Sequence, residues 1–292
     1  MDWHTARVIR THRRSSWLFI AHQPAQRLVV FVHGFMGKSI ESWRNFDTSG
    51  EISDWWRSSD MLFFGYDSLT DNILGTANRL RQLLADFYPH PPADFFTVQG
   101  TTIREYTGLP YQELVLVGHS LGGVVIRRAV LDFAHNWLVA RDVLREPLPE
   151  LLSARVFLFS PANGGFGPSG KLAIARELGL LRYAEVFLRA APAYSELQLG
   201  SAILRTTREM TKVILDKFEF LNLTALKPAV LFANPDNVVN VDRYWHDQEC
   251  DSCDGTSHSS VCKPDHSYWA PWYMVENQVV RLAVQPGQAY QA

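Results

Sequence analysis

One serine in the chain has the sequence context of an enzymatic nucleophile. Gly118, Ser120 and Gly122 form a G-x-S-x-G pattern that lies between an apolar run and a helical stretch. A serine on a sharp turn from strand to helix presents its hydroxyl, and the flanking glycines leave room for neighbouring backbone. Amides at the start of the helix point to the same place. We therefore predict a nucleophile at Ser120, with the Leu121 N–H as one donor to an oxyanion.

A second donor is expected from a loop that follows an earlier strand. The segment HGFMG, residues 33–37, comes directly after the apolar run 28–32. Its two glycines let the backbone curl toward a substrate carbonyl, and this loop supplies the second oxyanion donor in such sites. The predicted donor is the Phe35 N–H, with the Met36 N–H as the alternative.

A serine nucleophile also needs a base and a carboxylate that orients the base. In the matching chain order the carboxylate precedes the histidine. Asp236 lies in a turn after an apolar run, while Asp242 is the alternative and is favoured as a solvated carboxylate. His258 and His266 are both candidates for the base, and spacing alone does not separate them. His119, the neighbour of the nucleophile, is expected to point elsewhere and pack in the turn.

Strands and helices alternate along most of the chain. The predicted strands are apolar runs, at residues 28–32, 61–67, 113–120, 154–162 and 229–236. The predicted helices have apolar residues at helical spacing, at 71–88 and 121–137. This alternation predicts a mostly parallel sheet flanked by helices, within a single domain of residues 1–292. The helix-rich stretch 170–226 interrupts the alternation and predicts an inserted helical cap.

Composition and charge exclude several classes of protein. The 292 residues are 47% hydrophobic and 20% charged, which suits one large buried core. The net charge of −2 gives no electrostatic signal for a nucleic-acid partner, and no run approaches the roughly 18 apolar residues that span a bilayer.

The basic segment RVIRTHRR raises the question of a mitochondrial presequence, but the strand-like WLFIA follows it directly, so a place in the sheet is preferred. Three cysteines, an odd number, argue against a disulfide framework and favour a cytoplasmic protein.

The late cysteines offer a competing interpretation. Cys250, Cys253, His258 and Cys262 have the spacing C-x2-C-x4-H-x3-C, and three cysteines with one histidine can hold a structural zinc ion. If zinc bound His258, the role of base would pass to His266. Reduced, partly buried thiols in a loop are the preferred interpretation, so neither a metal nor another cofactor is expected.

Four segments resemble a known family. VVFVHGFMG, LVLVGHSLGGVVIRRA, FANPDNVV and HSSVCKP are similar to segments of the α/β-hydrolase serine esterases and lipases, especially the lipase-like serine esterases related to GPI inositol-deacylases. The likeness covers residues 27–165 and 228–264. It implies the α/β-hydrolase fold, an oxyanion loop at Gly34 and Phe35, and no metal cofactor. In that group the histidine of the H-S-x-x-C-K-P-like stretch is the base, which selects His258.

The predicted function is that of a serine hydrolase acting on carboxylic esters, with lipid esters as one candidate class. Ser120 attacks the ester carbonyl, His258 accepts and returns the proton, and Asp236 orients His258. The amides of Phe35 and Leu121 hold the oxyanion, and water releases the acyl group. An acyltransferase with the same triad and a catalytically silent binding protein with this fold are the alternatives.

Overall fold

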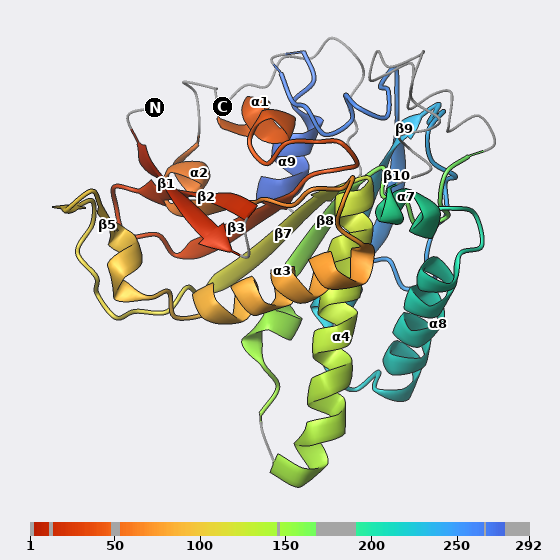
Figure 1. The fold of residues 1–292 in the computed structure, drawn as a ribbon, viewed down its shortest axis with the longest axis horizontal. Coiled ribbons are helices and arrows are strands. Elements are labelled where there is room, and N and C mark those ends of the chain that lie inside the picture. The colour runs from red at the N-terminus through yellow and green to blue at the C-terminus, as the bar shows by residue number, and fades with distance from the viewer. Residues whose placement is uncertain are drawn as a thin grey trace.

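The computed structural model describes residues 3–11, 14–47, 53–144, 147–167, 191–265 and 267–277. Within these ranges the chain forms an eight-stranded sheet with the order β1-β2-β4-β3-β7-β8-β9-β10 (Figure 1). Its strands are β1 (His4–Thr11), β2 (Arg14–Ala21), β3 (Arg27–Val32), β4 (Ser59–Phe64), β7 (Glu113–His119), β8 (Arg155–Phe159), β9 (Ala229–Asn234) and β10 (Glu249–Asp254). A separate hairpin pairs β5 (Thr97–Val98) with β6 (Thr101–Thr102).

The strand directions bring several loops to one edge of the sheet. β2 runs antiparallel to both of its neighbours, whereas every pair from β4 to β10 in the sheet order is parallel. In this register Val32 at the end of β3 pairs with Gly118, and His119 at the end of β7 pairs with Phe159. The carboxyl ends of these strands therefore lie side by side, where parallel sheets place their binding sites.

Helices cover both faces of the sheet (Figure 1). One face carries α3 (Ile73–Phe87), α4 (Leu121–Leu144), α7 (Pro192–Glu196) and α8 (Ala202–Lys217). The other face carries α1 (Arg44–Asp47), α2 (Asp54–Arg57) and α9 (Ala270–Asn277). Short 3₁₀ turns are η1 (Glu41–Trp43), η2 (Ala93–Phe96), η3 (Glu150–Ser153) and η4 (Thr224–Leu226). In the described residues, no helix combines the length and the apolar character needed to cross a membrane.

The strand β3 shows why its sequence is an unbroken apolar run. Leu28, Val30 and Val32 pack into the core under α3 and α4, while Val29 and Phe31 pack into the core on the other face. All five side chains are fully buried. Each such burial contributes about 1.5–3 kcal/mol. A strand covered on both faces cannot alternate apolar and polar residues, and the predicted sheet architecture with helices on both faces is confirmed.

The strands β10 and β8 differ from the elements that the sequence predicts there. The stretch ECDSCD, expected to be a loop, forms the strand β10, which pairs only with β9 and lies at the edge of the sheet. An edge strand is partly exposed to solvent and can carry polar residues. Because β10 has no apolar run, the sequence pattern did not predict it as a strand. The strand β8 ends at Phe159, earlier than expected, because the chain turns at Ser160 with a φ of 39°.

The amino-terminal basic segment is a strand. Residues 4–11 form β1 and pair with β2 in an antiparallel ladder that runs from His4 opposite Ala21 to Thr11 opposite Arg14. The stretch WLFIA that follows lies in β2, so its predicted place in the sheet is confirmed.

The predicted cap falls partly outside the described residues, which omit 168–190. Its second helical stretch forms α8, which begins at an N-cap serine, Ser201, whose side chain accepts a hydrogen bond from the Leu204 N–H. One side of α8 is buried and packs beside α4 (Figure 1). Whether residues 170–226 cover the site stays a prediction.

We expect Gly122→Ala to lower the free energy of unfolding by about 2–4 kcal/mol, because overpacking against rigid backbone cannot relax. A Cβ at this position would lie 2.0 Å from the Val32 carbonyl oxygen and 2.5 Å from that of His33. Urea unfolding measures the change. Gly167→Ala is the control, since a Cβ there meets no atom of the described residues closer than 3.8 Å. Equal losses in the two variants would contradict the expectation.

Candidate active site

The three residues predicted as nucleophile, base and acid meet at the carboxyl edge of the sheet. Ser120 follows β7, Asp236 follows β9, and His258 lies in the loop after β10. His258 Nε2 is 2.9 Å from Ser120 Oγ, and His258 Nδ1 is 2.9 Å from Asp236 Oδ2. Because a carboxylate can only accept, Nδ1 carries the proton and Nε2 is free to accept from the serine hydroxyl. This is the arrangement that a general base requires.

The nucleophile turn is strained and tightly packed. Ser120 has a φ of 53°, a left-handed conformation that costs a residue with a side chain about 1–3 kcal/mol. A Cβ on Gly118 would lie 2.8 Å from the Ile126 side chain, and a Cβ on Gly34 would lie 2.9 Å from Ser120 Cβ. The glycines on both sides therefore permit the close approach that the sequence pattern predicts.

The two predicted oxyanion donors are oriented by different elements. Leu121 is the first residue of α4, where a helix leaves its amides without intrahelical acceptors. The Met36 N–H donates to Ser68 Oγ at 2.7 Å and is thereby occupied. Within the described part of the chain, neither the Phe35 nor the Leu121 amide donates a hydrogen bond. This geometry favours Phe35 over Met36 as the second donor.

The Asp236 side chain is fully buried and accepts hydrogen bonds from several donors. Its Oδ1 accepts from the amides of Val238 at 3.0 Å and Val239 at 3.1 Å, while Oδ2 accepts from His258. Burial raises the pKa of this carboxyl. The hydrogen bond and charge of His258, together with the Ser160 side chain and the Val239 amide, lower the pKa by a larger amount. The net pKa lies below the ordinary value, so Asp236 is ionised at neutral pH.

Asp242, the alternative to Asp236, is paired with a residue outside the triad. Asp242 forms an ion pair with Arg208 of α8, with Arg208 Nη1 at 2.7 Å and 2.5 Å from its two carboxylate oxygens, and no hydrogen bond joins it to His258 in the described residues. The preferred interpretation of Asp242 as a carboxylate outside the site agrees with this pairing. His266 lies outside the described residues.

The geometry of the described residues does not favour the zinc interpretation of the cysteines. Cys250 and Cys253 are three residues apart on β10, so they point to opposite faces of the sheet and pack into different cores. Both ring nitrogens of His258 are already hydrogen-bonded. In the part of the chain that the structure describes, no three His, Cys, Asp or Glu side chains are grouped as metal ligands. Burial raises the pKa of Cys262 to about 12, so this thiol is neutral at pH 7.

Two histidines beside the triad are neutral at pH 7. Burial lowers the pKa of His33 to about 4, and its ring stacks on Tyr66 with centroids 4.1 Å apart. Burial also lowers the pKa of His119 to about 3, and the charge of His258 adds to this effect. His119 Nε2 donates to the backbone carbonyl of His258 at 2.7 Å. Its expected role in packing the turn therefore includes a contact with the loop that carries the base.

Sequence reasoning missed Ser160, a fully buried residue in the turn after β8 whose Oγ accepts a hydrogen bond from the Ala233 N–H at 2.9 Å. A polar residue directly after an apolar strand, FLF followed by Ser160, is the signal that could have found it. That signal is weak because hydroxyl residues commonly follow strands in turns.

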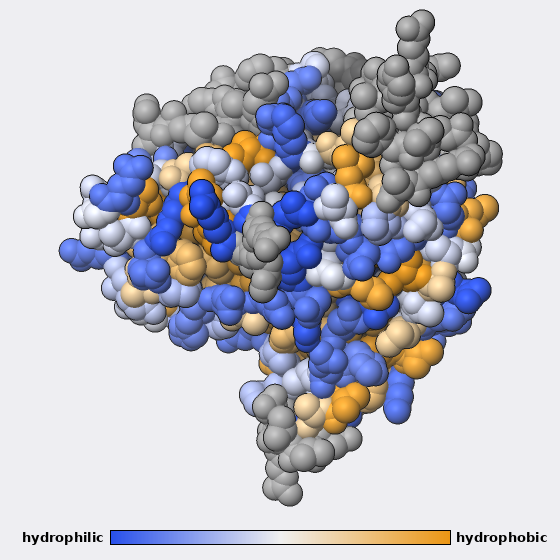
Figure 2. Space-filling view, in the orientation of Figure 1, coloured by the Kyte–Doolittle hydropathy of each residue, from blue (hydrophilic) through white to orange (hydrophobic). Residues whose placement is uncertain are grey.

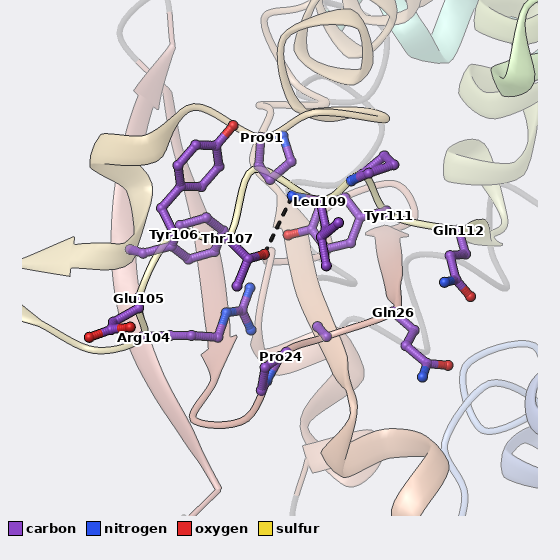
Figure 3. A pocket seen from close by; sticks show the side chains of 13 residues that line it. Pro24, Gln26, Pro91, Arg104, Glu105, Tyr106, Thr107, Leu109, Tyr111 and Gln112 are labelled. Carbon is purple, nitrogen blue, oxygen red and sulfur yellow. Dashed lines mark hydrogen bonds between the residues drawn. The ribbon is translucent and has the colours of Figure 1, made fainter.

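A cavity of about 210 Å³ lies elsewhere on the molecule (Figure 3). It borders Gln26 and Gln112, which directly precede β3 and β7, whereas Ser120 lies at the opposite, carboxyl end of β7. Arg104 in its lining pairs with the buried Asp60 at 2.7 Å, so its charge is already matched. This cavity is therefore separate from the triad residues.

Comparisons with known proteins identify the fold. No protein-family model matches the chain, and no curated protein matches by sequence. Among solved structures, carboxyl esterase 2 from the fungus Tuber melanosporum is 13% identical, with coverage of 95% of this chain and 85% of that one and a TM-score of 0.53. An α/β-hydrolase enzyme from a sediment metagenome of the Mar Chica lagoon, Morocco, is 15% identical, with 93% and 96% covered and a TM-score of 0.50.

A third similar structure is the peroxisomal α/β-hydrolase Lpx1 of Saccharomyces cerevisiae. It is 11% identical, with coverage of 95% of this chain and 88% of that one and a TM-score of 0.50. Together with the sheet order and the helices on both faces, these likenesses show that the chain has the α/β-hydrolase fold. At such low identity a structural likeness supports the fold and not an activity.

The lowered pKa of Asp236 predicts how acid changes stability. A carboxyl with a depressed folded-state pKa stabilises the fold above its unfolded pKa, and that stabilisation is lost as the pH falls through the folded value. We therefore expect the unfolding free energy of the wild type to fall more steeply than that of Asp236→Asn below about pH 4. Urea midpoints measured from pH 6 to pH 3 test this. Parallel pH curves would contradict the assigned ionisation.

Proposed function

We propose that this protein with the α/β-hydrolase fold is a serine hydrolase that cleaves carboxylic esters through an acyl-enzyme. The observation that carries the proposal is the continuous chain of hydrogen bonds from Ser120 Oγ through His258 to Asp236. Beside it lie two amides, of Phe35 and Leu121, that are available to an oxyanion. Nucleophile, base, orienting carboxylate and oxyanion donors together form the set that acyl transfer requires.

The geometry suggests the following sequence of steps. Ser120 Oγ attacks the ester carbonyl while its proton passes to His258 Nε2, and the carbonyl oxygen becomes an oxyanion held by the two amides. The tetrahedral intermediate then expels the alcohol, which takes the proton from His258, and the acyl group stays on Ser120. Water attacks the acyl-enzyme with His258 again as base, so that the carboxylic acid leaves and Ser120 is restored.

The neutral state of His119 supports this proton transfer. The rings of His119 and His258 have centroids 4.9 Å apart. A positive charge on His119 would oppose the imidazolium that forms when His258 accepts the serine proton. With the pKa of His119 lowered to about 3, that opposition is absent at neutral pH.

An aromatic cluster next to the oxyanion loop supports an apolar acyl group. The Phe35 ring lies 6.4 Å from that of Phe166 and 6.3 Å from that of Tyr194, and the last two stack at 5.2 Å. These rings come from the loop after β3, the loop after β8 and α7. Aromatic walls favour apolar ligands, so lipid-like esters are our preferred substrate class.

Three finer points are part of the proposal. We propose that residues 170–226 form a cap that shapes an apolar pocket, that the protein acts in the cytoplasm, and that it is related to the lipase-like serine esterases that resemble GPI inositol-deacylases. The three free thiols support the reducing compartment. The HSSVCKP segment around His258 supports the relationship.

The triad assignment predicts the behaviour of three variants in a p-nitrophenyl butyrate assay. Ser120→Ala and His258→Ala should each lower kcat by about 10⁴-fold or more, because the residues of a triad act as one unit. His266→Ala should keep wild-type activity, because His258 already contacts both partners. Circular dichroism verifies that each variant folds.

The activities of the His258→Ala and His266→Ala variants decide which of the two histidines is the base. A loss of activity in His266→Ala with activity retained in His258→Ala would transfer the base to His266. Added methanol tests the acyltransferase alternative, because a methyl ester would then replace the free acid as the main product. A folded wild type that turns over none of a broad panel of esters would overturn the hydrolase proposal.

The aromatic cluster predicts a change in acyl-chain preference. Phe166→Leu should lower kcat/KM for a long-chain ester by about 2- to 13-fold relative to an acetate ester, since an aromatic contact is worth about 0.5–1.5 kcal/mol beyond buried area. Phe157→Leu is the matched control, because Phe157 is equally buried but packs in the core on the other face of the sheet. An unchanged ratio in Phe166→Leu would remove the cluster from the substrate site.

A further inference from the structure

The loop that carries Phe35 is closed by a turn over residues 34–37. The Gly37 N–H donates to the Gly34 carbonyl at 3.0 Å, and Met36 has a φ of 56°. His33 Nδ1 also donates to the Gly34 carbonyl, at 2.8 Å. In a trans peptide the carbonyl and the N–H point in opposite directions. Two donors on the Gly34 carbonyl therefore direct the Phe35 N–H of the same peptide away from them.

The loop after β4, residues 65–68, holds this turn at two points. The strands β3 and β4 are parallel neighbours that pair to their last residues, so their two loops leave the sheet side by side. Ser68 Oγ accepts from the Met36 N–H at 2.7 Å. The Tyr66 hydroxyl donates to the His33 carbonyl at 2.6 Å. These two hydrogen bonds fix the backbone before and after Phe35.

Tyr66 and Ser68 have little contact with solvent. Tyr66 is 8% exposed and Ser68 is 3% exposed. The Tyr66 ring stacks on that of His33, with centroids 4.1 Å apart and an angle of 10° between the planes. Burial raises the pKa of Tyr66, so its hydroxyl stays protonated and can donate. A polar group that loses its partner in such a place is not readily satisfied by water, which favours the observed pairing.

The loop after β4 is itself anchored to a neighbouring strand. The Gly65 N–H donates to Ser16 Oγ of β2 at 3.0 Å. The Asp67 N–H donates to Asp71 Oδ2 at 3.0 Å, and Asp71 forms an ion pair with Arg14 of β2, also at 3.0 Å. The segment that holds the turn 34–37 is therefore tied to β2 and can act as a fixed support.

We propose that Tyr66 and Ser68 are positioning residues of the reaction: their hydroxyls hold the turn 34–37 so that the Phe35 N–H faces the oxyanion. This inference rests on the proposed hydrolase function. Ser68 also occupies the Met36 amide, whereas the Phe35 amide donates no hydrogen bond within the described part of the chain. A donor that is held in place before the substrate binds needs no reorganisation in the transition state.

The step that these residues support is the formation of the tetrahedral intermediate. Ser120 Oγ bonds to the ester carbon, its proton passes to His258 Nε2, and the electron pair of the C=O double bond moves to the oxygen. The Phe35 N–H binds this anion more strongly than the neutral carbonyl. A turn that has lost one support presents the amide in this direction less of the time, so kcat should fall while KM stays nearly constant.

The first test measures kcat and KM for p-nitrophenyl butyrate in Tyr66→Phe and Ser68→Ala. Each variant should lose about 5- to 100-fold in kcat, less than the roughly 10²- to 10³-fold cost of deleting an oxyanion donor. KM should change by no more than about twofold. Tyr66→Phe keeps the ring that stacks on His33 and removes only the hydroxyl. Wild-type kcat in either folded variant would overturn the assignment of that residue.

Tyr111→Phe and Ser59→Ala are the matched controls, because both hydroxyls are also buried and hydrogen-bonded. The Tyr111 hydroxyl donates to Asp60 Oδ2 at 2.6 Å, and Ser59 Oγ donates to the Trp55 carbonyl at 2.6 Å. Both residues lie at the opposite end of the sheet from the nucleophile, since Tyr111 precedes β7 and Ser59 begins β4. The controls should lose stability and keep kcat. Losses of kcat as large as in the two positioning variants would overturn the proposal.

A transition-state analogue tests the contact with the oxyanion itself. An alkyl trifluoromethyl ketone accepts Ser120 Oγ at its carbonyl carbon and forms an oxyanion, but it has no alcohol to expel. Its Ki should rise in Tyr66→Phe and Ser68→Ala by the same factor by which kcat/KM falls, and it should be unchanged in the controls. An unchanged Ki in a variant with lowered kcat would overturn the proposal.

Hydrogen exchange provides a measurement that is independent of turnover. Mass spectrometry follows the exchange of backbone amides in the peptide that contains residues 33–37. Ser68→Ala should speed this exchange, because the Met36 N–H then loses its acceptor, and Ser59→Ala should leave it unchanged. An ester-inactive wild type whose exchange still responds to Ser68→Ala would refute the hydrolase function but keep the support of the turn. Unchanged exchange in folded Ser68→Ala would refute that support.

Discussion

The close approach of the nucleophile turn to the end of β3 is the constraint on which the site depends. A Cβ on Gly122 would overlap the Val32 carbonyl, and one on Gly34 would touch Ser120 Cβ. Backbone lies against backbone here, so the start of α4 and the loop that carries Phe35 cannot move independently. The Phe35 and Leu121 amides, which we propose as oxyanion donors, are thereby held in fixed positions relative to Ser120 before any substrate binds.

The rest of the site follows from the register of the parallel strands. The ends of β3, β7, β8 and β9 lie side by side, and three of them lead into parts of the proposed site: the loop with Phe35 after β3, Ser120 after β7 and Asp236 after β9. His258 arrives from the loop after the edge strand β10. Burial keeps the neighbouring His33 and His119 uncharged at pH 7, so neither of these two rings opposes a proton on His258. Sheet geometry, not local sequence, assembles these groups.

Much of this arrangement could be predicted from the sequence because the strong signals are local. Runs such as LVVFV are apolar without interruption because both faces of β3 are covered. The glycines around Ser120 mark a turn that only small residues permit. The strand β10 escaped prediction because its edge position allows polar residues, and Ser160 escaped because the partner of its hydroxyl, the Ala233 N–H, is 73 positions away. Contacts made across a sheet leave no periodic trace in the sequence.

The central claim is that Ser120 is a nucleophile activated by its neighbours, and covalent capture tests it most directly. The folded protein would be treated with a fluorophosphonate and its tryptic peptides mapped by mass spectrometry. The account predicts one phosphonylated residue, Ser120, with labelling strongly slowed in His258→Ala because the serine proton then has no acceptor. A folded protein that is not labelled, or is labelled on a different serine, would contradict the account.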